Sequence, residues 1–545
     1  MGSEPHRLSP ADRDRVLSRA RGSHVDVVVV GGGITGSGCA LDAAARGLSV
    51  LLVEAGDLAG GTSSRSGKTA HGGLRYLEQL NFSLVAEALR ERDLMIGVTA
   101  PHLVGAEPFL LPTTRWWERP YFGAGVLAYD AMALARRRGA GVPAHRHLTR
   151  RGTLALAPGL DASVVTGGIR YHDGRMDDAR HTLAVARTAA ARGALVLSHA
   201  RVTGMRVEGG RVRGVAVRTA EGDELEVSAG AVVNAAGVWA ADVQAMAGEP
   251  AFAVRPAKGV HLLVERDAFD SRAGLIARAE DSVIILRRWY GRWLLGTTDT
   301  GYDGDRASPG VDAEDVDYLL RNVNRYLERP LTRSDLLGAH AGLRPLLASR
   351  DTSTTSALSR DHAVLTDHGM VTVVGGKYTT YRLMARDAVD AAGRVLGRRL
   401  PPSPTARIPL VGARDWPDVA GRAAQLSSEY GVAEHHVRRM LGRYGDETPH
   451  VLAPVRHDPG LGRTVAGYLL AEIRHAVTHE GARTLEDVLA RRTRIALEAP
   501  DGGLGQAPAV ASLVAPLLGW DGAGAEREVA GYRAAVGRDR AALGG

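Results

Sequence analysis

The fold is decided by Asp-Val-Val-Val-Val-Gly-Gly-Gly-Ile-Thr-Gly at residues 26–36, an alanine-rich stretch after it, and Leu-Ser-Val-Leu-Leu-Val-Glu at residues 48–54. The two valine- and leucine-rich runs are typical of short strands that are buried on both faces in a parallel sheet. A helix between them completes a strand–turn–helix–strand unit, which is the arrangement that binds dinucleotides.

The glycines of this turn occupy the positions of a G-x-G-x-x-G fingerprint. Gly31 allows the tight turn, Gly33 lets the backbone approach a pyrophosphate, and Gly36 lets the helix pack close to the strand. The first N–H groups of the helix, around Ile34 and Thr35, would face that pyrophosphate. A glycine-rich turn that serves only packing would explain the same glycines.

Glu54 argues against that alternative, because it ends the second strand, where a carboxylate accepts hydrogen bonds from a ribose. We therefore predict a bound dinucleotide. FAD is favoured over NAD because the unit lies near the N-terminal end of a long chain and no second unit of this quality follows.

The composition is that of a globular enzyme with two or three domains: 545 residues, 45% hydrophobic and 24% charged. The net charge of +7 suits an acidic substrate or an anionic membrane surface. No basic run is interleaved with aromatic residues, so we expect no nucleic-acid partner. The single cysteine, Cys39, allows no intramolecular disulfide and favours a reducing cytoplasm. We see no signal peptide and no spanning apolar run, and we predict no metal site.

Lysine is rare in this chain. Of the 68 basic residues, only Lys68, Lys258 and Lys377 are lysines, and all three lie in glycine-rich, polar segments. A compact ammonium differs from a planar guanidinium in size, hydration and hydrogen-bond geometry. We infer that these three sites need the compact group, although chance retention is the alternative.

A segment rich in glycine, serine and threonine at residues 61–76 is the second motif. Its hydroxyls and backbone N–H groups suit a pyrophosphate or the edge of a flavin ring, and its last residues supply a base, a cation and a phenol. We predict that Thr62, Ser63, Ser64, Lys68 and His71 bind the cofactor, and that His71, Arg75 and Tyr76 belong to the catalytic site.

Two later turns are also candidates for the cofactor site. Ala236 and Gly237 follow an apolar strand, at a point where the chain passes close to the cofactor in two-dinucleotide-fold flavoproteins. Gly376, Lys377 and Thr379 precede a helix, and backbone N–H groups there could stabilise negative charge on a reduced flavin.

Several cations fall in these loops. Arg344 is held between glycine and proline, and it joins Arg75 and Lys377 as a catalytic candidate. A flavin needs only modest positive charge, so the surplus implies an anionic substrate. Arginine suits bidentate binding of phosphate or carboxylate, although each could instead be a surface ion-pair partner.

We expect three regions. Residues 1–24 form a polar N-terminal tail, residues 25–400 the oxidoreductase region, and residues 405–545 a helical C-terminal domain after a proline-rich linker. Within the oxidoreductase region the expected cofactor-binding parts are about 25–100, 170–250 and 355–398, and the expected substrate parts are about 101–169 and 251–354.

The chain resembles the FAD-dependent glycerol-3-phosphate dehydrogenases. The matching stretches are Val30–Gly47, Gly375–Ala385, Thr62–Ser64 with His71–Glu78, Gly296–Asp299, Ser359–Asp361, and a C-terminal series from Ala471 to Thr493. One departure is Gly67, where a serine is expected before the lysine.

The resemblance implies a Rossmann-like, two-dinucleotide-fold domain of the D-amino-acid-oxidase type, an antiparallel substrate domain and an all-α C-terminal domain. It also implies that Arg75, Arg344 and Lys377 orient sn-glycerol 3-phosphate while FAD accepts the C2 hydride. The product is dihydroxyacetone phosphate, and the electrons pass to a membrane quinone. His71 and His261 are the candidates for the base. A homodimer is possible.

Other readings stay open. A glycerol-3-phosphate oxidase would pass electrons to oxygen and release peroxide. An amine or amino-acid oxidase is disfavoured by the cation cluster, and a non-catalytic flavin-binding regulator predicts no substrate-dependent reduction.

Residues 115–138 gather aromatic residues and arginines in a chain that is only 5% aromatic. Such a segment suits a peripheral contact with anionic lipid, which would place the protein at the inner face of the cell membrane. A buried aromatic cluster is the alternative.

Overall fold

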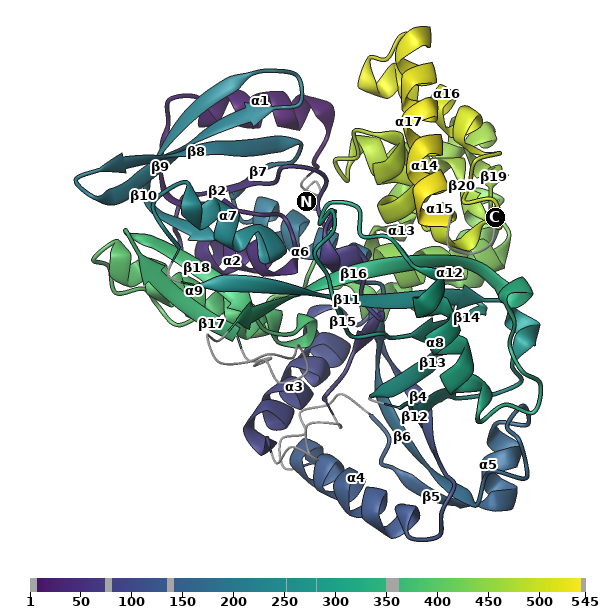
Figure 1. Ribbon diagram of the computed structural model, residues 1–545. Coiled ribbons are helices and arrows are strands. Elements are labelled where there is room, and N and C mark those ends of the chain that lie inside the picture. The colour runs from purple at the N-terminus through teal and green to yellow at the C-terminus, as the bar shows by residue number, and fades with distance from the viewer. Residues whose placement is uncertain are drawn as a thin grey trace.

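The computed structural model describes residues 7–73, 81–134, 142–250, 252–280, 282–348 and 362–540. Within these ranges the chain forms two large sheets, helices that cover them, and a helical C-terminal domain beside both (Figure 1). This is the predicted fold class, which is confirmed.

The first sheet has the strand order β17-β18-β10-β1-β2-β7, and β9 and β8 extend it beyond β10. The central pairs β18–β10, β10–β1, β1–β2 and β2–β7 are parallel. The strands are β1 (His24–Val30), β2 (Val50–Val53), β7 (Leu195–Leu197), β8 (Ala200–Glu208), β9 (Arg211–Thr219), β10 (Glu224–Asn234), β17 (His362–Asp367) and β18 (Met370–Gly375).

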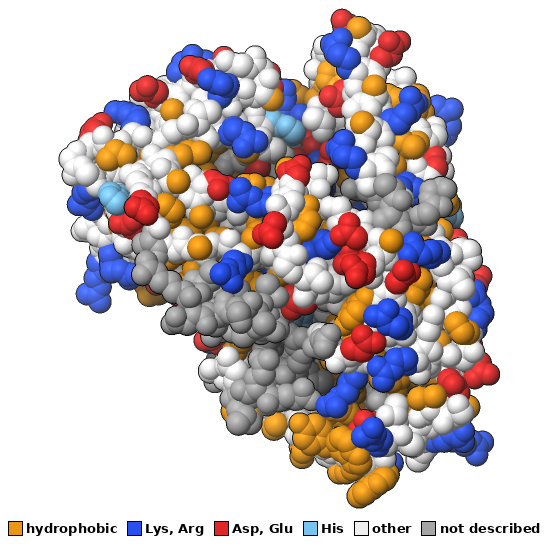
Figure 2. Space-filling view, in the orientation of Figure 1, with side chains coloured by type: hydrophobic (Ala, Val, Ile, Leu, Met, Phe, Trp, Pro, Cys, Tyr) orange, Lys and Arg blue, Asp and Glu red, His pale blue; other side chains and the backbone are white. Residues whose placement is uncertain are grey.

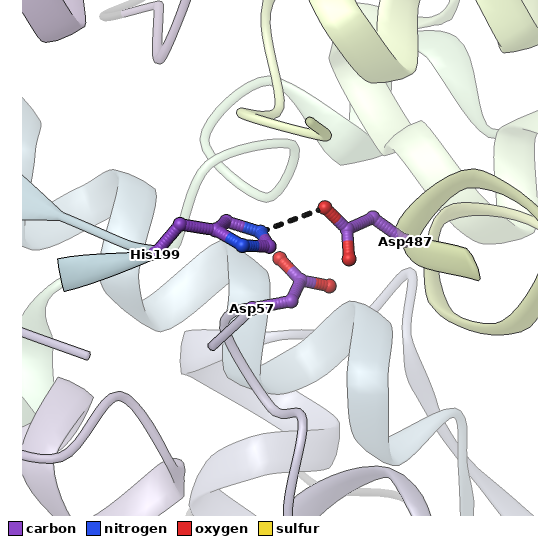
Figure 3. A group of neighbouring side chains, drawn as sticks. All are labelled: Asp57, His199 and Asp487. Atoms are coloured by element: carbon purple, nitrogen blue, oxygen red, sulfur yellow. Dashed lines mark hydrogen bonds and ion pairs between the residues drawn. The ribbon is translucent and has the colours of Figure 1, made fainter. Parts of the chain in front are cut away.

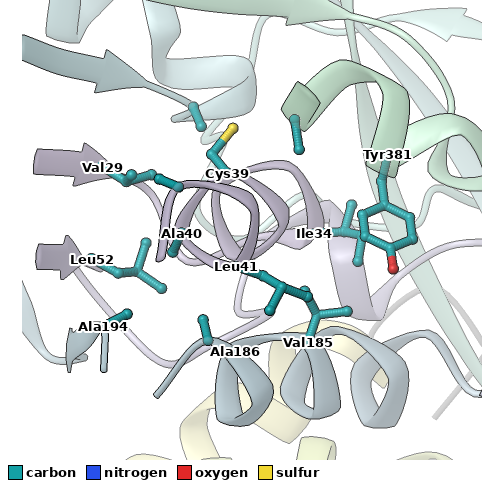
Figure 4. Packing of buried hydrophobic residues seen from close by; sticks show 14 of the residues in the cluster. Val29, Ile34, Cys39, Ala40, Leu41, Leu52, Val185, Ala186, Ala194 and Tyr381 are labelled. Carbon is teal, nitrogen blue, oxygen red and sulfur yellow. The ribbon is translucent and has the colours of Figure 1, made fainter. Parts of the chain in front are cut away.

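Helix α2 (Ile34–Ala45) lies against this sheet between α6 (Asp178–Ala191) and α9 (Tyr381–Val395) (Figure 4). Small residues permit this close packing. A Cβ atom on Gly38 would lie 3.0 Å from the ring of Tyr381, and the next residue of the helix, Cys39, is fully buried. The alanine-rich stretch of the sequence is therefore the contact surface of α2. Helices α1 (Pro10–Ala20) and α7 (Ala240–Ala245) complete this half of the molecule.

The second sheet is antiparallel except where β12 pairs with β4. Its order is β15-β11-β14-β13-β12-β4-β6-β3, with β16 paired to β11 and β5 paired to β6. The strands are β3 (Thr69–Ala70), β4 (Val104–Thr113), β5 (Arg146–Thr149), β6 (Gly167–Met176), β11 (Ala253–Val264), β12 (Gly274–Arg278), β13 (Val283–Trp289), β14 (Arg292–Gly296), β15 (Thr300–Gly301) and β16 (Leu336–Ala348). Its helices are α3 (Phe82–Leu94), α4 (Glu118–Leu134), α5 (Arg150–Leu156) and α8 (Ala313–Asn324).

The C-terminal domain is helical apart from a short hairpin, and two apolar clusters form its core. Its elements are α10 (Trp416–Val419), α11 (Ala423–Tyr430), α12 (Glu434–Tyr444), α13 (Thr448–Leu452), β19 (Thr464–Val465), β20 (Tyr468–Leu469), α14 (Leu470–Thr478), the π-helix η13 (Asp487–Arg492), α15 (Ile495–Glu498), α16 (Ala507–Leu518) and α17 (Gly522–Arg540). Among the described residues, no helix is both long enough and apolar enough to cross a membrane.

Two predicted boundaries need correction. Residues 1–24 are not all tail, because α1 begins after a capping box formed by Ser9 and Asp12 and buries Ala20 completely. The division at residue 169/170 falls inside β6, whose whole length belongs to the second sheet. Nothing in the composition of residues 167–176 shows to which of the two sheets this strand belongs.

Candidate functional site

One cavity of about 2270 Å³ runs between the two sheets and reaches the C-terminal domain. Small-molecule pockets typically measure about 300–1,000 Å³, so this cavity has room for a dinucleotide and a second molecule. Its walls come from the β1–α2 turn, the segment after β2, the turn after β10, strands β11 and β16, the turn before α9, and residues next to η13.

The β1–α2 turn fits a pyrophosphate. Gly31 has a φ of +108°, and a Cβ atom there would lie 2.6 Å from the carbonyl oxygen of Ala235. A Cβ atom on Gly36 would lie 1.8 Å from the carbonyl oxygen of Gly31. Gly33 is the N-cap of α2, and as a glycine it has no side chain to cap the helix. The Ser63 hydroxyl accepts the N–H of Ile34 at 2.9 Å, so the helix N-terminus and this hydroxyl face the cavity together, where a phosphate would lie.

Glu54 lies at the end of β2 and lines the same cavity. Its carboxylate accepts the N–H of Gly32 at 2.6 Å and the N–H of Gly56 at 2.7 Å. Burial raises the pKa of Glu54, and these two N–H groups oppose that shift. The carboxylate is thus fixed where a ribose of the dinucleotide would lie.

The opposite wall comes from two other turns. Gly375 and Gly376 have φ angles of +75° and +80°, which turns the chain from β18 into the short helix before α9. The Thr379 hydroxyl donates to the carbonyl of His71 at 3.2 Å. The Thr62 hydroxyl donates to the carbonyl of Leu343 at 2.6 Å. These bonds join segments that lie far apart in the sequence into one continuous wall.

Arg344 is the cation whose orientation is best defined. Its Nη1 lies 3.0 Å from the Asp299 carboxylate, and its Nη2 donates at 3.2 Å to Thr297 Oγ1 and to the carbonyl of Thr298. Lys258 lies on the adjacent strand β11, where Asp312 and Asp315 bind its ammonium. A fixed guanidinium at a cavity wall suits an anionic ligand.

His261 stacks on His340 across β11 and β16, with ring centroids 5.1 Å apart. Burial lowers the pKa of His261 to about 3, and the nearby charges of Lys68 and Arg344 act in the same direction. The sequence does not show how deeply His261 is buried, and so it could not show this lowered pKa. At neutral pH this imidazole carries no charge.

Most of the predicted site residues meet in this cavity. Those that line it are Gly31, Gly33, Ile34, Thr35, Glu54, Thr62, Ser63, His71, Ala236, Gly237, His261, Arg344, Gly376, Lys377 and Thr379. Gly36 and Ser64 lie just behind the wall, where Gly36 serves packing and the Ser64 hydroxyl donates to the carbonyl of Gly61. Arg75, Tyr76 and the 359–361 stretch lie outside the described residues.

The structure contradicts the prediction that the side chain of Lys68 binds the cofactor. Its side chain is buried and turned away from the cavity, and its Nζ lies 2.8 Å from Asp178 Oδ1 and 2.9 Å from Asp178 Oδ2. Burial lowers the pKa of Lys68 to about 8, and Asp178 opposes the shift. The compact ammonium of Lys68 therefore binds a buried carboxylate of the protein, that of Asp178, and does not face the cofactor site.

The sequence analysis missed Asp173, a buried cavity-wall residue on β6. Its carboxylate accepts the N–H of Gly72 and the hydroxyl of Tyr129, each at 3.1 Å, and lies 3.2 Å from Arg92 Nη1. It thereby anchors the backbone beside His71. No local pattern marks this residue, because its partners come from three distant segments.

Asp57, His199 and Asp487 meet at the end of the cavity near Glu54 (Figure 3), and their ligand atoms lie within 4.8 Å of one another. His199 Nε2 lies 2.9 Å from Asp487, while Arg491 and Arg492 both donate to Asp57. Arg491 and Arg492 place two guanidinium groups on these carboxylates. The cluster therefore suits an ion-paired contact between the domains, called the clasp below, better than a metal site.

Residues 26–382 match the FAD dependent oxidoreductase family, and residues 403–525 match the C-terminal domain of alpha-glycerophosphate oxidase. The chain is 50% identical over 536 residues to glycerol-3-phosphate dehydrogenase 2 of Mycobacterium tuberculosis, covering 97% of this chain and 91% of that protein. It is 34% identical over 547 residues to the human mitochondrial glycerol-3-phosphate dehydrogenase, covering 95% of this chain and 74% of that protein.

Among solved structures, the glycerol-3-phosphate dehydrogenase from Bacillus halodurans complexed with FAD is similar, with a TM-score of 0.80 and 28% identity over 98% of both chains.

Proposed function

This chain belongs to the family of FAD-dependent glycerol-3-phosphate dehydrogenases, and from that premise we propose that it oxidises sn-glycerol 3-phosphate to dihydroxyacetone phosphate. FAD is the cofactor of this family, and the glycine-rich N-terminus of α2 and the fixed Glu54 carboxylate fit it. The observation that carries the proposal is the presence of Arg344 and Lys377 in the same cavity as these two features.

In the proposed mechanism Arg344 and Lys377 bind and orient the phosphate and hydroxyls of the substrate. Asp299 and the Thr297 hydroxyl keep the Arg344 guanidinium in one orientation, so little freedom is lost when the phosphate binds. FAD, when bound, supplies the acceptor for the C2 hydride. Arg75 and Tyr76 remain part of the proposed site on the strength of the sequence.

A base must remove the proton of the C2 hydroxyl, and His71 and His261 both line the cavity. With a pKa of about 3, His261 is unprotonated at neutral pH but a weak base. A bound phosphate dianion beside it would raise that pKa, because negative charge stabilises the imidazolium. Both histidines therefore remain candidates for the base in the proposed mechanism.

The test of the activity is anaerobic. Purified holoenzyme is mixed with sn-glycerol 3-phosphate while the flavin absorption is followed, and rapid bleaching is expected. A flavin that stays oxidised would contradict the proposal and would favour an amine oxidase or a non-catalytic flavin-binding regulator.

We propose a membrane quinone as the electron acceptor. One side of the cavity is apolar and passes beneath α4; it is lined by Phe109, Leu111, Tyr121, Phe122, Val126, Ile276 and Ile285. Such a wall suits a lipophilic ring better than the polar substrate. Oxygen is the alternative acceptor, favoured by the match of residues 403–525 to a domain named for an oxidase. Peroxide yield after air is admitted, compared with reduction of a quinone analogue, separates the two.

The outer face of α4 and the segment just before it, which contains Trp116, support a peripheral membrane contact. Trp116 is 83% exposed, Tyr121 53% and Leu127 61%, and Figure 2 shows hydrophobic side chains gathered at this end of the molecule. The same helix lines the apolar side of the cavity, so a quinone in the bilayer would have a short route inward. We therefore propose a cytoplasmic protein held at the inner face of the cell membrane. We also propose a homodimer, which analytical sedimentation would test.

The membrane contact makes a specific prediction. Trp116→Ser with Leu127→Ser should lower flotation with anionic liposomes about tenfold or more, because interfacial binding scales with the apolar area that is buried. Val207→Ser, at an apolar residue of β8 that is 44% exposed, is the matched control. Equal flotation of all three proteins would exclude α4 as the contact. Reduction of a water-soluble dye should stay unchanged in both variants.

A further inference from the structure

The carboxylate of Asp178, the first residue of α6, is completely buried and binds the loop that precedes β3. Its Oδ2 accepts the backbone N–H of Ser66 at 2.9 Å and the Ser66 hydroxyl at 2.7 Å. Lys68 Nζ bridges both carboxylate oxygens at 2.8 and 2.9 Å. One side chain of α6 therefore fixes the backbone and two side chains of this loop.

Arg494, from the C-terminal domain, binds the same carboxylate. Its Nη2 donates to Asp178 Oδ1 and to Asp177 Oδ1, each at 2.6 Å, and its Nη1 donates to the carbonyl of Ser64 at 3.5 Å. The guanidinium is buried, and burial opposes its charge, but Asp177 and Asp178 outweigh that effect and raise the pKa of Arg494. A single cation of the C-terminal domain thus holds the N-terminus of α6 and the loop together.

The loop that it holds is a wall of the cavity. Arg65, Ser66 and Gly67 line the cavity, and a Cβ atom on Gly67 would lie 3.0 Å from His261 Nε2. On its other side the loop rests on β16, where His340 Nε2 donates to the carbonyl of Ser66 at 3.3 Å. The wall facing His261 is therefore set by contacts to α6 on one side and to β16 on the other.

The conformation of Lys68 shows that the loop is held in place. Its φ is +56°, in the left-handed region that residues other than glycine rarely adopt. Such a conformation persists only when the surroundings fix it. The fixing contacts are the ammonium on Asp178 and the Lys68 carbonyl, which accepts the N–H of Met176 at 2.9 Å and a donor from Arg287.

We propose that Arg494 is a positioning residue of the oxidoreductase site: with Asp178 it sets the place of residues 64–68 and so the cavity wall opposite His261. The C-terminal domain then completes the site rather than only covering it. The kinetic part of the test rests on the proposed function, because it uses sn-glycerol 3-phosphate; the structural part does not.

The test uses full-length holoenzyme with Arg494→Gln. Loss of the charge-assisted hydrogen bonds should speed amide exchange in the peptide that covers residues 62–69 about tenfold or more, since the Asp178 carboxylate that accepts the Ser66 N–H would then be held by one cation fewer. KM for sn-glycerol 3-phosphate should rise about tenfold, with a smaller change in kcat and full FAD content. Arg494→Lys should recover part of both effects, because an ammonium can still reach Asp178.

Arg187→Gln is the matched control. Arg187 lies on α6, the helix that begins with Asp178, and its side chain is as buried as that of Arg494. It pairs with Glu447 of the C-terminal domain at 2.6 and 2.9 Å. Its loss should lower the melting temperature as much as Arg494→Gln does, while exchange at 62–69 and KM stay as in the wild type.

Two outcomes would overturn the proposal: equal exchange and KM changes in the Arg187 and Arg494 variants, or no change at 62–69 in Arg494→Gln. If Arg494→Gln does not fold, Arg494→Lys against Arg187→Lys makes the same comparison. If the wild-type flavin is not reduced by sn-glycerol 3-phosphate, the proposed function fails, and amide exchange still decides the role of Arg494.

Discussion

At the scale of single residues, the sequence was most informative where function depends on neighbours in the chain. Gly31, Gly33 and Glu54 lie within one strand–turn–helix–strand unit, and spacing alone was enough to place them at the cavity. Lys68 shows the limit. A lysine in a polar loop looks like a ligand-binding group, but the carboxylate that binds it comes from α6, far along the chain.

Glu54→Gln should weaken FAD binding about 10- to 100-fold. An amide would place an NH₂ group against the N–H of Gly32 or Gly56, which the carboxylate now accepts, and a charged hydrogen-bond acceptor for the ribose would be lost. The measurement is titration of apoprotein with FAD, followed by flavin fluorescence. Glu226→Gln, at an exposed residue of β10, is the control. Unchanged FAD affinity in Glu54→Gln would exclude this residue from the ribose site.

At the scale of elements, strands and helices with clear apolar periodicity were predictable, and their partners were not. β3 is two residues long and joins the second sheet by pairing Thr69 and Ala70 with Arg175 and Gly174 of β6. A strand of two residues is too short to show a hydrophobic periodicity in the sequence. The π-helix η13 is a similar case, because its role comes from Asp57 and His199 on distant loops.

The clasp that η13 makes should retain FAD. Arg491 donates to Asp57 and Asp487 where the cavity passes Glu54, so Arg491→Gln should release FAD about tenfold faster after dilution, as seen by fluorescence of the freed flavin. Arg218→Gln, which removes an exposed pair with Glu224 between β9 and β10, should release it at the wild-type rate. Equal release from all three proteins would show that the clasp does not close the cavity.

The same clasp should depend on pH through His199. Burial lowers its pKa, but Asp487 outweighs burial and the net shift is upward. The His199–Asp487 pair is therefore complete below the ordinary histidine pKa and is lost as the pH rises through the raised one. FAD release from the wild type should accelerate over that rise. His199→Gln should abolish the acceleration; a variant that kept it would place the titrating group elsewhere.

At the scale of the whole molecule, the sequence predicted a separate helical C-terminal domain but not its part in the cavity. That part depends on buried ion pairs between segments hundreds of residues apart, such as Arg180 with Glu480 and Arg187 with Glu447. Each partner, read alone, looks like an ordinary surface charge. Only the packed structure shows that removing one of them would leave the other buried and uncompensated.

Burial also leaves several histidines uncharged, and this makes a prediction for the whole fold. Burial lowers the pKa of His102 and of His261 to about 3, and that of His181 to about 4. Between these values and the ordinary histidine pKa the unfolded chain binds more protons than the folded one, so stability falls as the pH falls.

The expected loss between pH 7 and pH 5 is about 2 kcal/mol for each fully buried histidine. Glu480, a buried carboxylate, does not contribute to this loss. Burial raises the pKa of Glu480, but Arg180 outweighs burial and holds that pKa well below its ordinary value, so Glu480 keeps its charge throughout this range. The urea midpoint should therefore drop steeply from pH 7 to pH 5. In His102→Leu the drop should shrink by about 2 kcal/mol, whereas His24→Gln, at an exposed residue, should leave it unchanged. A midpoint that stays constant to pH 5 in the wild type would mean that these histidines accept protons without unfolding the chain.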